Sequence, residues 1–180
     1  HGLAAPSAPL LFQPQSPAGP PAAHFPEYIT PPCPPPAGGW PYRRNGVHDQ
    51  NLKFDIGDLL RTVAAVTVVT FRPEPDQAVL VVAASDPNIV ESVLRPQLPD
   101  RLCVIASRFS RAQLDEVRNT VTDHLDDWAL DFVGESADEQ AQARIEVQLL
   151  RVTPDLADWA ATMPDGLLVL KPSLTPVAAG

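Results

Sequence analysis

Proline limits what this chain can fold into more than any other residue, because it fixes one backbone torsion and lacks a backbone N–H donor. Of the 22 prolines, 13 fall within the first 45 residues, where Gly, Ala, Ser and Gln supply most of the remainder. That stretch has no periodic apolar pattern from which a core could be built. We therefore expect a disordered proline-rich leader over residues 1–45 and one folded domain over residues 46–180.

The folded domain is expected to belong to the α+β class. Ser110 and Gln113 have the spacing of a capping box, and Leu114, Val117 and Val121 follow at helical spacing, as do Leu125 and Trp128. Elsewhere, β-branched runs and alternating apolar residues indicate strands. In chain order the expected elements are a helix at 55–60, strands at 63–71 and 78–84, a helix at 86–95, a strand at 102–106, a helix at 110–128, strands at 130–134 and 145–152, a helix at 153–163 and a strand at 167–170. In the strand at 145–152, Glu146 and Gln148 alternate with apolar residues, which predicts one solvent-exposed face, and the loop before this strand is expected to be acidic and mobile.

The second half of the domain repeats the pattern of the first. Residues 86–89 correspond to 153–156, each a helix cap followed by proline, and residues 99–102 correspond to 164–167. Chance similarity between two capped helices is the alternative to a repeat. The repeat predicts two αββαβ units, at about 55–107 and 108–171, with helices packed on antiparallel or mixed sheet and an apolar interface between the units.

Charge and hydropathy exclude some classes of partner. The net charge of -9 and the pI near 4.7 repel phosphate backbones, and no Lys/Arg cluster interrupts the acidic balance, so nucleic-acid binding is not expected. No run reaches the roughly 18 apolar residues of a membrane-spanning helix, so membrane insertion is not expected either. The chain begins with His1, which indicates removal of a signal peptide or of other flanking sequence. We expect a secreted or cell-surface protein.

The leader carries one cysteine and one candidate lid. Cys33 lies among the prolines of residues 31–36, where a stiff segment could present its thiol to a second chain; a free thiol without a role is the alternative. The other cysteine, Cys103, falls in an expected buried strand. Two cysteines are too few for a thiolate metal site. Trp40, in a turn near the end of the leader, is a candidate lid over the core.

The strongest candidates for chemistry are acidic. Asp123, His124 and Asp127 have a spacing that could bind a divalent metal, with Glu135 and Asp138 as further weak candidates, and a solvated helix face is the alternative interpretation. No G-x-S-x-G elbow or glycine-rich phosphate loop occurs. We therefore expect no catalytic residues, no cofactor and no firm metal site, and we expect both Trp128 and Trp159 in the core.

One stretch carries a family resemblance. Residues 107–117, the helix that begins within them, the hairpin after Trp128 and the strand at 145–149 resemble one repeat of the prodomains of secreted bacterial chymotrypsin-like proteases. The resemblance covers about a third of the chain, implies a chaperone or inhibitor role, and assigns no site residues; the protease part is absent from this sequence. The αββαβ order is also similar to periplasmic lipid-surface modules of the BON type, although the acidic charge does not suit a lipid surface.

The function expected from the sequence is a non-catalytic interaction module. Its partner would be another protein, bound by a sheet face or an edge strand, with the leader as a spacer; an oligomer is also possible. One alternative is a small metal-assisted enzyme that uses the acidic region 115–139. Another is a structural or assembly protein cross-linked through Cys33.

Overall fold

The chain forms two αββαβ units, one after the other. The structure is a computed structural model, and it describes residues 28–42 and 56–174. The first unit contains α2 (Gly57–Thr62), β1 (Ala65–Phe71), β2 (Val79–Ala84), α3 (Pro87–Leu94) and β3 (Leu102–Ala106). The second contains α4 (Arg111–Asp123), β4 (Leu130–Ala137), β5 (Ala143–Leu149), α5 (Pro154–Ala160) and β6 (Leu168–Pro172). The expected α+β class is confirmed.

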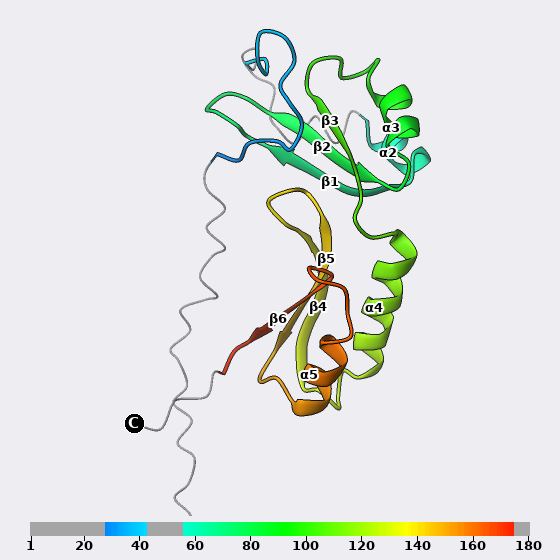
Figure 1. The fold of residues 1–180 in the computed structure, drawn as a ribbon, viewed down its shortest axis with the longest axis vertical. Coiled ribbons are helices and arrows are strands. Elements are labelled where there is room, and N and C mark those ends of the chain that lie inside the picture. Colours follow the sequence, from blue (N-terminus) through cyan, green and yellow to red (C-terminus); the bar gives the residue numbers. More distant parts are fainter. Residues whose placement is uncertain (1–27, 43–55, 175–180) are drawn as a thin grey trace, which may run out of the picture.

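Each unit has its own three-stranded sheet, ordered β1-β2-β3 and β4-β5-β6, and Figure 1 shows the two sheets one above the other. In both, the first two strands are antiparallel and the last two are parallel. Both antiparallel pairs also have an irregularity at the same place, after Ala65 in β1 and after Leu130 in β4. The residues just before these strands, Ala64 and Ala129, have positive φ angles of 50° and 48°. The two units therefore share the register irregularity and the residue with positive φ, as well as the order of their elements.

Local capping explains where the longer helices begin. Asp86 accepts hydrogen bonds from two backbone N–H groups of α3, Ser110 and Gln113 form a complete capping box on α4, and Thr153 caps α5. No helix in the two described stretches is long and apolar enough to cross a membrane.

Helix α4 is shorter than expected, because it ends at Asp123 rather than at residue 128. Acidic side chains are unfavourable at a helix C-terminus, and Asp123 is followed closely by Asp126 and Asp127. Leu125 consequently lies in a turn with 40% of its surface exposed, while Trp128 returns to the core as expected.

The β4–β5 connection is also more ordered than expected. Strand β4 continues to Ala137 and β5 begins at Ala143, so a tight turn replaces the mobile acidic loop expected between them. The Asp138 carboxylate accepts hydrogen bonds from the backbone N–H groups of Gln140 (2.8 Å) and Gln142 (2.9 Å). These bonds hold the turn in one shape.

The first sheet is buried on both faces. On one face, Leu80, Val82 and Leu102 pack with residues of α2 and α3. On the other face, Val79, Val81 and Cys103 pack against Trp40. Because both faces are covered, every residue of β2 is buried.

Residues 28–42 cover that second face, so the contact between leader and domain is longer than the turn at Trp40 that was expected to touch the core. Figure 1 shows this segment in blue on the side of the sheet opposite α2 and α3. The backbone N–H of Ile29 donates to the Arg72 carbonyl (2.8 Å), and the Gln77 side chain donates to the Trp40 carbonyl (2.9 Å). Trp40 is 8% exposed, so its expected role as a lid is confirmed. We call residues 28–42 the strap.

A disulfide between Cys33 and Cys103 fastens the strap to β3. The sequence interpretation left Cys33 either free or bridged to a second chain, and the structure contradicts both. The two cysteines are 70 residues apart in sequence, and their Cα atoms lie 5.6 Å apart. Such a pairing cannot be predicted from spacing alone.

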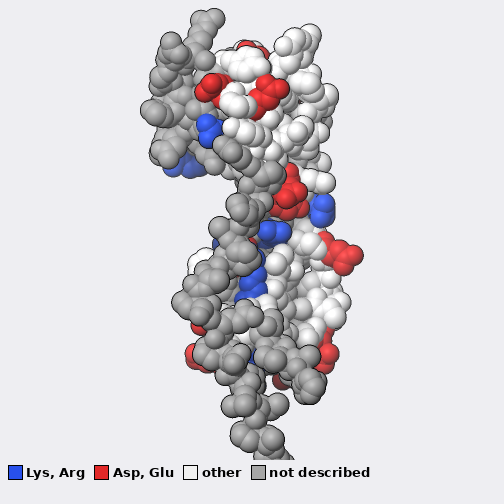
Figure 2. Space-filling view, turned by 90° about the vertical axis from the view of Figure 1, so that its left-hand side faces the viewer, with Lys and Arg blue, Asp and Glu red and all other residues white. Residues whose placement is uncertain are grey.

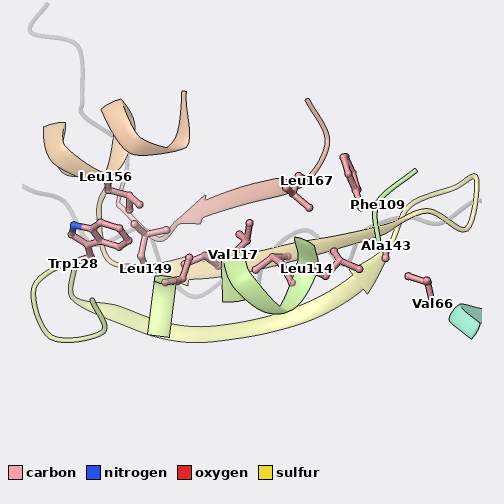
Figure 3. Close-up of a cluster of buried hydrophobic side chains, with 12 residues drawn as sticks. Val66, Phe109, Leu114, Val117, Trp128, Ala143, Leu149, Leu156 and Leu167 are labelled. Atoms are coloured by element: carbon pink, nitrogen blue, oxygen red, sulfur yellow. The ribbon is translucent and has the colours of Figure 1, made fainter. Parts of the chain in front are cut away.

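The second sheet buries one face only. Ala143, Ile145, Val147 and Leu149 alternate inward along β5 and pack with Leu114 and Val117 of α4 and Leu156 of α5. Figure 3 shows this cluster between the helices and the sheet. Trp128 is buried at one end of this cluster, and Trp159 packs partly buried against it. Helices α4 and α5 thus both lie on the inner face.

The contact between the units is more polar than expected. The Thr67 hydroxyl donates to the Ala141 carbonyl (2.5 Å), and Arg111 donates to the Val66 carbonyl (2.7 Å) and pairs with Glu135. The hydrogen bond to Glu135 raises the pKa of Arg111. In the buried clusters formed by residues 28–42 and 56–174, only Val66 and Ala141 pack with residues of the other unit.

Candidate binding surface

The outer face of the second sheet is a surface that no helix or strand of the described residues covers. Because side chains alternate along a strand, the residues that do not face α4 and α5 point together to the opposite side. We call this side the open face. Figure 1 shows no described element packed over it. It is formed by Phe132, Gly134 and Ser136 of β4, Arg144, Glu146 and Gln148 of β5, and Val169 and Lys171 of β6.

A connected network of polar groups fixes the centre of the open face. Lys171 Nζ lies 2.7 Å from Glu146 Oε1, the Ser136 hydroxyl donates to Glu146 Oε2 (3.2 Å), and Arg144 Nε donates to that hydroxyl (3.1 Å). The hydrogen bond from Lys171 holds the pKa of Glu146 below its usual range, against a smaller opposing effect of burial. The carboxylate is thus ionised and held in place at neutral pH.

An exposed aromatic side chain lies beside this network. Phe132 is 52% exposed, and its ring covers Gly134: a Cβ atom at position 134 would stand 2.5 Å from two carbon atoms of the ring. Glycine is therefore required for the ring to lie in this place. Leu150, which is 46% exposed, continues the outward alternation one residue beyond β5. The open face combines an apolar end with a charged centre.

Figure 2 views the molecule from the side away from α4. Lys and Arg side chains gather along the middle of this side, and Asp and Glu lie toward its edges in the lower half. The chain is acidic as a whole, with a net charge of -9. This side therefore differs in its charge pattern from what the overall composition would suggest.

The structure does not bring the expected metal candidates together. Asp123 ends α4, and His124 contacts Asp127 (3.4 Å) while its ring stacks on Trp128. Of the other two candidates, Glu135 pairs with Arg111 and Asp138 holds the β4–β5 turn. No group of three potential ligands occurs within residues 28–42 and 56–174. Four of the five candidates have contacts of their own that account for their positions.

The sequence pattern predicts the solvent-exposed face of β5, but it did not predict the exposed aromatic side chain of Phe132 beside it. The alternation of Glu146 and Gln148 with buried residues was visible in the sequence. A glycine two residues after an aromatic in a strand was the available signal for Phe132 and Gly134. Comparison with models of protein families and with curated proteins finds no match for this chain.

Proposed function

We propose that this chain is a non-catalytic, secreted or surface-exposed interaction module that binds another protein through the open face of its second sheet. The observation that carries the proposal is the difference between two otherwise equivalent sheet faces. The strap covers one of these faces, and the described residues leave the other uncovered, with an ordered aromatic and a fixed set of charges.

The register of the strands makes the comparison residue by residue. Ala84 pairs with the first residue of β1, as Leu149 pairs with the first residue of β4. Counting back from these, Val79, Val81 and Ala83 of β2 match Arg144, Glu146 and Gln148 of β5. The first set is apolar, and its members Val79 and Val81 pack with Trp40 of the strap, whereas the second set is polar. A polar face is stable in water when no partner is bound. The open face is therefore suited to a transient interaction.

The composition of the open face indicates the chemistry of the partner. Phe132 and Leu150 offer an apolar anchor, and aromatic anchors carry much of the energy at protein interfaces. Lys171 and Arg144 beside them favour an acidic group on the partner, and the Glu146 carboxylate repels an acidic group that is not placed next to these two cations. A complementary surface would present an apolar side chain flanked by a carboxylate.

The secreted or surface-exposed location is part of the proposal. An in-chain disulfide is compatible with an oxidising compartment such as the extracellular space. A disulfide between chains through Cys33 no longer has support, because Cys33 is paired within the chain.

The test is capture followed by direct measurement. The immobilised protein is exposed to the extracellular fraction of its source, and any captured protein is identified, purified and titrated against wild type. Phe132→Ala should weaken its binding about 30-fold, which corresponds to a 2 kcal/mol interface anchor. Leu125→Ala is the matched control, since Leu125 is also exposed but lies beyond α4.

Two outcomes would contradict the proposal. Equal binding by wild type and Phe132→Ala would place the contact elsewhere on the molecule, and failure to capture any extracellular protein across a range of conditions would leave the module without a partner. Concentration-dependent sedimentation of the free chain, abolished by Phe132→Ala, would instead identify a second copy as the occupant of the open face.

A further inference from the structure

A second candidate site lies on the first unit, where a pocket of about 280 Å³ runs along β3 between α3 and the strap. Pro34 and Pro36 form one wall, and Leu102 and Val104 of β3 contribute to the other. The disulfide partner Cys33 also lines the pocket. The strap wall is therefore fixed to the strand that it faces.

Three charged residues border the pocket, and two of them are already engaged. Arg95 Nε donates to Glu91 Oε1 (2.5 Å), and Arg95 Nη1 donates to the backbone carbonyls of Pro99 (3.3 Å) and Leu102 (3.2 Å). The third residue, Asp100, is exposed and has no hydrogen bond or ion pair with any residue that the structure describes. The border of the pocket thus carries two carboxylates and one guanidinium. The guanidinium pairs with Glu91, so the Asp100 carboxylate has no cationic partner among the described residues.

We propose that this pocket binds a Lys or Arg side chain of a partner protein. The aliphatic stem of such a side chain would pack on Pro34, Pro36 and Leu102, and its cation would pair with the Asp100 carboxylate. An acidic side chain would meet repulsion from Asp100, because Glu91 and Arg95 neutralise each other. A purely apolar side chain would shield Asp100 from water without giving it a partner, which costs free energy.

The pocket is independent of the open face. It depends on the strap, and the second unit has no counterpart of the strap among the residues described. The two proposals can therefore fail separately, because one rests on the first unit and the other on the second.

The proposal is tested by titrating the ¹⁵N-labelled full chain with N-acetyl-arginine amide and, in parallel, with N-acetyl-norleucine amide. The second probe has a similar aliphatic stem but no charge. Arginine amide should give saturable shifts at the Trp40 indole N–H and at the backbone amides of Leu102 and Val104. Absence of saturable shifts, or equal shifts with norleucine amide, would overturn the proposal.

Charge variants distinguish an ion pair between Asp100 and arginine amide from a general attraction of this cation to an acidic protein. Asp100→Asn should weaken the binding of arginine amide by up to about fivefold, the contribution of one exposed ion pair. Asp126→Asn removes the same charge from an exposed turn of the second unit and should leave the affinity unchanged. An equal loss in both variants would show that only the net charge matters, and the pocket would then have no specific role.

Discussion

At the scale of single residues, the open face depends on a glycine as much as on the aromatic beside it. The Phe132 ring lies where a Cβ atom of residue 134 would be, so any larger residue must push the ring away. We expect Gly134→Ala to reduce partner binding severalfold while changing the free energy of unfolding by less than about 1 kcal/mol. Titration calorimetry and urea unfolding measure the two effects.

Gly57→Ala provides the control for that variant. A Cβ atom at Gly57 would meet nothing within 4 Å, so this change adds the same methyl group without displacing a neighbour. If Gly134→Ala bound as tightly as wild type, the position of the Phe132 ring would not matter for recognition.

The Glu146 carboxylate gives the open face a defined response to acid. The hydrogen bond from Lys171 is the main reason that the pKa of Glu146 lies below its usual range in the folded protein. A lowered pKa means that the ionised carboxylate stabilises the fold above the pKa of the unfolded chain, and that this stabilisation is lost as the pH falls through the folded pKa. The charged pair is therefore intact at neutral pH.

We expect wild type to be more stable than Glu146→Gln at pH 7, and the difference to shrink as the pH falls below about 4. Urea unfolding at several pH values measures this difference. Glu116→Gln, on the exposed side of α4, should differ little from wild type at pH 7. A Glu146→Gln difference that grew toward acid pH would contradict the assignment.

At the scale of elements, the tip of the β4–β5 hairpin joins the two units. Ala141 is fully buried against the cluster that contains Trp40 and Phe71, and its φ angle of 59° lies in the left-handed region. Beside it, the Gln142 side chain accepts from the Arg108 N–H (2.7 Å) and donates to the Ala106 carbonyl (3.1 Å). Ala141 therefore contacts the first unit, and Gln142 contacts both the end of β3 and the segment that connects the units.

Ala141→Val should lower the free energy of unfolding by about 2 kcal/mol, because a β-branched residue is disfavoured at this φ and two extra methyl groups would have to fit at a fully buried position. Ala141→Gly should be nearly neutral, since it relieves the backbone but loses one buried methyl group. Chemical denaturation of both variants tests this point. A stable Ala141→Val protein would mean that the hairpin tip does not hold the units together.

Elements governed by local sequence were the ones that could be predicted. The helix starts at Asp86, Ser110 and Thr153 follow from capping groups and prolines within a few residues. The repeated αββαβ order followed from the same signals. In contrast, the acidic composition after Ala137 indicated a mobile loop. The structure has a tight turn there, because Asp138 accepts hydrogen bonds from backbone N–H groups.

Features that join distant parts of the sequence could not be predicted. The pairing of Cys33 with Cys103 brings together residues 70 positions apart. The polar alternation of β5 was visible, but its pairing with Phe132 required the antiparallel register. Of the metal candidates, His124 and Asp127 are in contact, but no three potential ligands gather within residues 28–42 and 56–174.

At the scale of the whole molecule, the disulfide attaches the strap to the first unit and encloses a long loop of chain. For a 70-residue separation, loop entropy alone predicts a stabilisation of about 4 kcal/mol. Reduction of wild type should therefore lower the unfolding midpoint markedly. Cys33→Ser should unfold at the lower midpoint with or without reductant.

Non-reducing gels complement that measurement. Both cysteines are consumed within the chain, so the protein should run as a monomer and show no free thiol before unfolding. A reduced protein as stable as the oxidised one would contradict a structural role for the strap, and a disulfide-linked dimer would contradict the pairing.

The most direct test of the central claim is site-specific photo-crosslinking to the captured partner. A benzophenone side chain is introduced at Gln148, in the middle of the open face, and in a second protein at Glu116, on the opposite side of the unit. We predict a crosslinked complex from position 148 and none from position 116. Crosslinking from position 116 alone would show that the partner binds the helical side, and the open face would then not be the binding surface.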